Sequence, residues 1–242
     1  MGFAPALHSE WIKIRTLRSL VGGLCAVLLA TVGFSALAGV ATATDADDFD
    51  PLFAAFFGVN FGQIAAVAFG TTAVSAEFQT GTLRVSLAVV PQRGRWFAAK
   101  LTAIALPVLA VGLTTGLVTL VVGSAVLGEK AAGLSMSESL RGVVGCAVYL
   151  TLMALLAAGL TALLRSGAAV LSILVPFLLI VSFVIGDLSG DVADFLPDRA
   201  GQVALRTRWD GVLGPWTGLA VTAVWALAAV AAGAWRVRRR DA

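Results

Sequence analysis

The sequence predicts an all-α polytopic membrane protein, because most of the chain consists of long apolar intervals that carry no charge. Hydrophobic residues make up 59% of the 242 residues and charged residues only 13%, whereas a soluble domain carries about 25% charged residues. The charges are clustered and leave six charge-free intervals of 21 to 28 residues. Since about 20 apolar helical residues cross the hydrocarbon core, each interval is long enough to span it. We expect transmembrane helices near residues 19–44, 51–76, 101–128, 142–164, 166–186 and 211–235.

The segment that precedes the first span, residues 1–18, combines basic residues with an apolar face. Leu7, Trp11 and Ile14 fall on one side of a helix, while Ile12 points away from them. A basic helix that carries a tryptophan just before a span is typical of the membrane interface. We expect an interfacial helix at 1–18 and a single six-span domain over 19–242.

The distribution of basic residues predicts which loops face the cytoplasm. Twelve of the 17 lysines and arginines fall on the side of the termini, and this bias places both termini in the cytoplasm. The same basic face suits anionic lipid headgroups, and no nucleic-acid partner is needed to explain it. Arginine outnumbers lysine 14 to 3, which suggests a GC-rich bacterial genome and a bacterial plasma membrane.

The second interval carries the candidate substrate path. Two amides, Asn60 and Gln63, lie one helical turn apart and face the same side. They are compatible with a mostly apolar path for hydrophobic or amphipathic cargo, but equally with an interhelical hydrogen bond. The aromatic residues expected along the path are Phe53, Phe56, Phe57 and Phe61.

Several classes of function are disfavoured by what the intervals lack. No ionisable residue lies within the six intervals, and proton- or sodium-driven carriers usually place such groups there. His8 is the only histidine, so no metal site is expected. No phosphate-binding loop occurs either. We therefore expect no enzyme activity, and a partner chain must supply the energy if the protein transports.

The longest loop expected on the cytoplasmic side, residues 77–100, is predicted to contain a short amphipathic helix. Leu83, Leu87 and Val90 fall on one face, and Pro91 ends the pattern. Such a helix either docks in a groove of a partner protein or lies in the headgroup layer with its arginines extended to water. Periodicity alone leaves both alternatives open.

The residues of this loop carry a family resemblance. The run Glu77-Phe78-Gln79-Thr80-Gly81-Thr82-Leu83-Arg84, followed by Pro91, Arg93, Arg95 and Lys100, resembles the first cytoplasmic loop of type 2 permease subunits of ATP-binding cassette (ABC) exporters. The stretch from Leu7 to Arg15 resembles the N-terminal elbow helix of the same family. Six spans with both ends inside extend the resemblance over the whole chain.

The resemblance implies a permease homodimer with two ATPase subunits, which bind ATP and Mg²⁺, while this chain binds no cofactor. The loop helix becomes a coupling helix, with contacts from Glu77, Thr80, Gly81, Thr82, Leu83, Arg84, Leu87, Pro91, Arg93 and Arg95. The second and fifth spans line the central cleft in that family, which adds Pro176 and Phe177 to the path. The external loop, residues 187–210, forms either short helices over the cleft or a loose surface loop.

The expected function is a transport subunit that exports a hydrophobic or amphipathic small molecule or peptide, with antibiotics and drugs among such cargoes. Two other classes remain open: a membrane protein that anchors or assembles others without transport, and an ion-coupled carrier. The absence of charged residues from the six intervals argues against the carrier.

Overall fold

The computed structural model describes residues 2–41, 49–79, 92–131, 133–181, 184, 190–209 and 211–239, and within these ranges the chain is helical with no β-strand. The long helices are α1 (Phe3–Thr16), α2 (Arg18–Ala41), α4 (Val59–Gln79), α6 (Arg93–Leu127), α7 (Met136–Leu164) and α11 (Pro215–Arg239). The shorter elements are α3 (Pro51–Ala55), η1 (Gly128–Ala131), α8 (Gly167–Pro176), η2 (Phe177–Val181), η3 (Gly190–Phe195), α10 (Pro197–Gln202) and η4 (Val203–Leu205).

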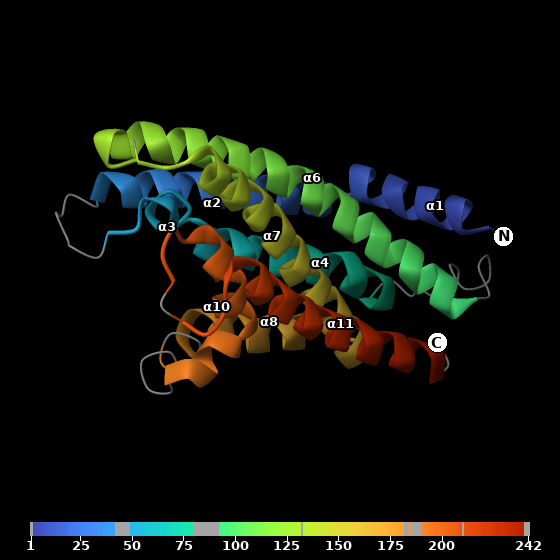
Figure 1. Ribbon diagram of the computed structural model, residues 1–242. Helices are drawn as coiled ribbons and strands as arrows, with labels where there is room; N and C mark the ends of the chain where they lie inside the picture. Colours follow the sequence, from blue (N-terminus) through green and yellow to red (C-terminus); the bar gives the residue numbers. More distant parts are fainter. Residues whose placement is uncertain are drawn as a thin grey trace.

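The protein is a multi-pass, all-α membrane protein. In the described part of the chain, five helices are long and apolar enough to cross a membrane, namely α2, α4, α6, α7 and α11. A shorter apolar helix covers Gly167–Ile180, within the fifth interval. Figure 1 shows both termini at the same end of the bundle, which we call the terminal end.

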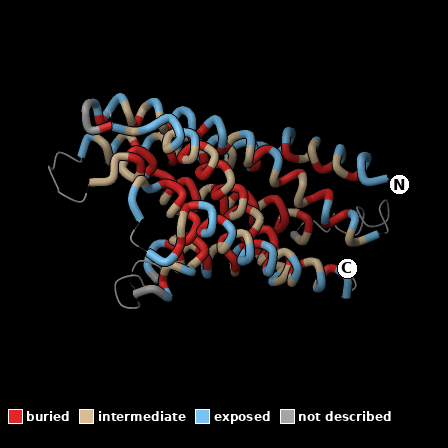
Figure 2. Tube along the Cα trace, in the orientation of Figure 1, coloured by how far each residue is buried: buried red, intermediate tan, exposed pale blue. Residues whose placement is uncertain are grey.

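Helix α7 forms the centre of the bundle. It packs against α4, α6 and α11. In its most apolar stretch of 18 residues, 72% of the residues are buried, compared with 22% in the corresponding stretch of α2. Figure 2 shows the buried residues concentrated on the inner sides of the helices, with exposed residues on the outside. The exposed side chains of α2 and α6 are large and apolar, among them Leu29, Leu37, Leu117 and Val121, as expected for surfaces that face lipid.

Two pairs of glycines allow the helices to approach closely. A β-carbon at Gly58 would lie 1.9 Å from the carbonyl oxygen of Thr31, and one at Gly62 would lie 1.9 Å from Thr31 Oγ1. Gly112 and Gly116 face α7, since a β-carbon at Gly112 would lie 2.8 Å from Ala147 Cα and one at Gly116 would lie 3.0 Å from the carbonyl oxygen of Val143. These positions are spaced as in small-residue helix contacts, so α2 packs directly on α4 and α6 on α7.

The second apolar interval is divided into two helices rather than one. Asp50 caps α3 by accepting hydrogen bonds from the N–H groups of Leu52 and Phe53, both at 3.0 Å. A turn over residues 56–58 follows, and the N–H of Gly58 donates to Ser35 Oγ of α2 at 2.9 Å. The interhelical bond satisfies a donor that the break would otherwise leave buried without a partner.

The segment expected as an external loop contains short helices. Elements η3, α10 and η4 cover residues 190–205, and α10 and η4 pack against α7 and α11. Proline at the first position of α10 favours helix initiation, and Ala200, Gly201, Ala204 and Leu205 are buried. Of the two alternatives, the short helices are therefore correct for 190–205. In Figure 1, α3 and α10 lie toward the end opposite the termini.

Candidate functional site

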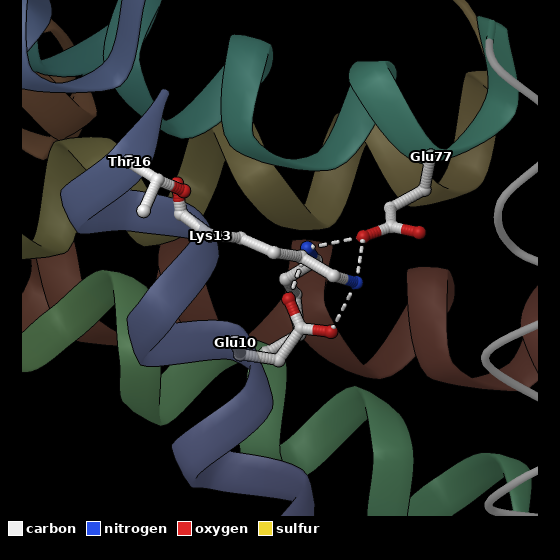
Figure 3. A network of polar contacts seen from close by, with 5 residues as sticks. Glu10, Lys13, Thr16 and Glu77 are labelled. Atoms are coloured by element: carbon white, nitrogen blue, oxygen red, sulfur yellow. Dashed lines mark hydrogen bonds and ion pairs between the residues drawn. The ribbon is translucent and has the colours of Figure 1, made fainter. Parts of the chain in front are cut away.

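At the terminal end, four charged side chains from three helices form a network of ion pairs, which we call the ionic cluster: Glu10 and Lys13 of α1, Glu77 of α4 and Lys100 of α6. Lys13 Nζ lies 2.8 Å from Glu10 Oε1 and 2.7 Å from Glu77 Oε1. Lys100 Nζ pairs with Glu10 Oε2 and lies 2.8 Å from Glu77 Oε1. Figure 3 shows the side chains of Glu10, Lys13 and Glu77 pointing toward one another.

The ionic cluster is almost completely removed from solvent. Glu10, Glu77 and Lys100 are each less than 5% exposed, whereas the Lys13 side chain is 31% exposed. Burial of a charge is expensive unless it is paired, and here two carboxylates meet two ammonium groups. The formal charges cancel, so the cluster can lie among apolar helices.

The environment of Lys13 raises its pKa. Its partial burial disfavours the charged ammonium and lowers the pKa, but the hydrogen bonds to Glu10 and Glu77 and the negative charges of both carboxylates together raise it by more. The net result is a pKa above the ordinary value for lysine. Lys13 therefore stays protonated at neutral pH, as the ion pairs require.

The structure shortens the loop expected at residues 77–100. Helix α4 continues to Gln79, and α6 already begins at Arg93, so Glu77, Arg93, Arg95 and Lys100 belong to helices. The apolar helix α4 therefore extends beyond the charge-free interval 51–76 and carries an ionisable residue, Glu77, near its end. Pairing in the ionic cluster explains the extension, because it neutralises Glu77 and lets the helix continue past the apolar interval.

The expected coupling contacts are only partly within the described residues. Arg93 Nη1 donates to the carbonyl oxygen of Val237 at 3.3 Å, which joins the start of α6 to the end of α11. Arg95 lies on the exposed side of the same turn. The remaining expected contacts fall outside the described residues: Thr80, Gly81, Thr82, Leu83, Arg84, Leu87 and Pro91.

The N-terminal helix has a buried face that differs from the expected stripe. Ala6, Glu10 and Ile14 are buried against the bundle, while Leu7 is half-buried against the core and Trp11 is half-buried. Ile12 is 48% exposed, so it does point away from the bundle. The buried face is therefore centred on Glu10, whose ion pair with Lys100 holds α1 against α6, while Lys13 links α1 to Glu77 of α4.

At the opposite end of the bundle, a cavity of about 490 Å³ lies between α4, η2 and the short helices of residues 190–205. It reaches the surface, since Phe57 and Trp209 line it and are 37% and 42% exposed. The volume is within the range of ligand sites. Its lining comprises Phe53, Phe57, Asn60, Phe61, Gln63, Leu178, Leu179, Asp194, Asp198, Arg199, Gln202, Val203, Arg206, Trp209, Gly211 and Leu213.

A chain of polar side chains lies against this cavity. Tyr149 of α7, completely buried, donates its hydroxyl hydrogen to Gln63 Oε1 and accepts a hydrogen bond from Gln202 Nε2 at 3.4 Å. Gln63 also donates through Nε2 to the carbonyl oxygen of Asn60 at 3.2 Å. Three helices, α4, α7 and α10, are thereby linked where the two glutamines face the cavity.

Charged side chains at the mouth of the cavity connect the segments on its two sides. The Arg206 guanidinium lies 4.7 Å from the centre of the Phe53 ring, a favourable cation–π distance. Asp50 accepts hydrogen bonds from the N–H groups of Thr207 and Arg208 at 2.8 and 3.3 Å through Oδ2, while its other oxygen caps α3. One carboxylate therefore joins both sides of the mouth.

Most of the residues expected along a substrate path line this cavity. Phe53, Phe57, Asn60, Phe61 and Gln63 line it. Gln63 also makes the interhelical hydrogen bond that was the alternative interpretation, so the two interpretations are compatible. The other expected residues do not line it: Phe56 is 1% exposed in the core, and Pro176 and Phe177 lie just before Leu178 and Leu179, which do.

Several residues of both sites were not predicted from the sequence. Tyr149 is the only tyrosine in the chain and lies within an apolar interval, a signal that could have identified it. Glu10 is the only acidic residue before the first span and could have indicated a partner inside the bundle. Asp198, Gln202 and Arg206 gave no such signal, because they lie in a short polar segment without periodicity.

Comparison with known proteins does not assign the chain to a family. No protein-family model matches it, and no curated protein sequence matches it significantly. The functional interpretation therefore depends on the resemblance of the loop and on the geometry of the two ends.

Proposed function

We propose that the protein is the permease subunit of an ABC exporter, which moves a hydrophobic or amphipathic compound outward with energy from a separate ATPase. The observation that carries the proposal is the ionic cluster, because it anchors both sides of the 80–92 connection to α1. Glu77 lies two residues before the end of α4, and Lys100 two helical turns after the start of α6. A force applied to this connection would therefore move α1, α4 and α6 together.

Besides the five long apolar helices, we propose a sixth span, an interfacial elbow helix and cytoplasmic termini. The remaining span, the fifth in chain order, includes α8 and η2, and α1 lies at the inner interface as the elbow. Both termini are cytoplasmic, in agreement with their position at one end of the bundle and with the excess of basic residues on their side. Two copies of the chain pair in a bacterial plasma membrane and bind two ATPase subunits.

The cavity at the opposite end is the proposed binding site for cargo on the external side. Aromatic rings line much of it, and Asn60, Gln63 and Gln202 supply a few orienting hydrogen-bonding groups. This combination suits a molecule with an apolar body and a polar end. Cargo in this position would leave through the mouth between Asp50 and the 206–208 segment.

The direct test is affinity purification of the full-length protein from its native membrane, followed by an ATPase assay and identification of co-purified chains. We expect an ATPase subunit with a phosphate-binding loop in the wild-type sample, and its loss in Leu83→Asp. Met136→Asp is the matched control, since Met136 is 84% exposed and lies at the start of α7, outside this connection. Absence of an ATPase from an active preparation would refute the proposal.

The buried carboxylates favour one alternative, an ion-coupled carrier, because Glu10 and Glu77 are ionisable groups within the bundle. Uptake into sealed vesicles separates the two functions. ATP-dependent transport that survives collapse of the ion gradients supports the exporter, whereas transport that needs a gradient and ignores ATP supports the carrier.

A further inference from the structure

A second, shallower hollow of about 410 Å³ lies along the last turns of α11, at the terminal end. Ala231, Ala234, Trp235, Arg238 and Arg239 line it. These positions recur every three or four residues and therefore form one stripe on the helix. The hollow has an alanine-lined part toward the middle of the helix and a cationic part at its end.

The cationic part holds two guanidinium groups that lack acidic partners. Arg238 and Arg239 are exposed, and within the described residues neither makes an ion pair. Arg239 lies 4.9 Å from the centre of the Trp235 ring. Trp235 is 53% exposed, and an exposed tryptophan at the end of an apolar helix is typical of the level of lipid headgroups.

The start of α6 brings a further cation to the same place. Arg93 Nη1 donates to the carbonyl oxygen of Val237, and a β-carbon on Gly94 would lie only 3.0 Å from Arg238 Nη2. The N-cap residue Gln92 makes no side-chain hydrogen bond. Arg238 and Arg239 thus lie near a helix start that carries a partial positive charge, which favours an anion at this place.

We infer that this hollow is a binding site for an anionic phospholipid of the leaflet on the terminal side. Arg238 and Arg239 hold the phosphate, Trp235 lies beside the glycerol region, and one acyl chain follows Ala234 and Ala231. The apolar part distinguishes a lipid from free phosphate, because a phosphate ion would leave the alanine surface uncovered. The inference requires only that the chain spans a membrane and is independent of the proposed transport function.

The test compares phosphatidylglycerol with phosphatidylcholine of the same acyl chains, added to the detergent-purified protein and followed by native mass spectrometry. We expect the wild type to prefer phosphatidylglycerol by about thirtyfold, since two arginines act on the headgroup. The double variant Arg238→Gln/Arg239→Gln should lose this preference. The charge-matched control Arg15→Gln/Arg18→Gln should keep it, since both arginines are exposed at the same end but outside the hollow.

A second measurement keeps the inference testable if the double variant is unstable. Phosphatidylglycerol with a brominated chain should quench tryptophan fluorescence in the wild type, and most of that quenching should disappear in Trp235→Phe. Glycerol phosphate, which lacks acyl chains, should not displace the lipid. Equal binding of the two lipids, equal loss in both double variants, unchanged quenching in Trp235→Phe, or displacement by glycerol phosphate would each overturn the inference.

Discussion

The two ends of the bundle use polar residues in opposite ways. At the terminal end, the four charges of the ionic cluster satisfy one another, and three of them are less than 5% exposed. At the opposite end, Asn60, Gln63 and Gln202 line a cavity of about 490 Å³. At the terminal end the polar groups hold helices together. At the opposite end some polar groups line a cavity that a ligand can fill.

This difference predicts where mutations affect stability and where they affect binding. Removal of one charge from the ionic cluster leaves an uncompensated buried charge, which is costly. Removal of a polar group at a cavity leaves its former partner within reach of water. Substitutions at the terminal end should therefore reduce stability more than substitutions of similar size at the cavity.

Lys100→Met should have the strongest effect, because it removes a buried cation that pairs with both Glu10 and Glu77. We expect the free energy of unfolding to fall by about 3–5 kcal/mol, measured by denaturant titration in mixed micelles. Arg18→Met, which removes an exposed cation at the same end, is the control and should change stability little. Equal stability of the two variants would show that the ionic cluster does not hold this end together.

Gly201→Ala should be the most harmful single change near the cavity. A β-carbon at this position would lie 2.3 Å from Tyr149 Cδ2 and 2.8 Å from Thr222 Oγ1, so α10 would have to move away from α7. Overpacking of this kind costs about 1–3 kcal/mol, to be measured in the same titration. Gly33→Ala in α2 is the control, since nothing lies within 4 Å of a β-carbon there, and it should not destabilise.

Tyr149→Phe should have a smaller effect, since it removes one hydroxyl and keeps the ring. Gln63 loses its interhelical donor and Gln202 loses its acceptor, which should cost about 1 kcal/mol. A double-mutant cycle with Gln63→Leu measures the coupling directly. A coupling energy of zero would mean that the hydrogen bond between α4 and α7 contributes nothing.

The pH dependence contributed by Lys13 should be the weakest effect. The pKa of Lys13 is raised by its two carboxylate partners, so its contribution is complete below the pKa of the unfolded chain, about 10.4. It is lost only as the pH rises through the higher pKa of the folded state. Comparison of wild type and Lys13→Met should give a constant stability difference from pH 7 to 9 that shrinks above about pH 10.4. A difference that already shrinks near neutral pH would contradict the assigned ion pairs.

The general fold could be predicted from sequence because apolar length alone decides which segments can cross a membrane. The positions of Asn60 and Gln63 along one lining followed from helical periodicity in the same way. The break at residues 56–58 could not be predicted, because it depends on Ser35 of another helix accepting the freed N–H group. The expected loop at 77–100 was too long for a similar reason. A charged residue such as Glu77 indicates a loop in the sequence, and only its partners on α1 and α6 explain why it lies in a helix.

The ionic cluster also bears on the order in which the protein assembles. Glu10 lies 90 residues before Lys100 and 67 before Glu77 in the chain, and α1 emerges from the ribosome long before either partner exists. Its two charges must remain hydrated at the membrane surface until α6 has been synthesised. Docking of the first helix is therefore a late event in biogenesis, and a nascent chain released before residue 100 cannot complete it.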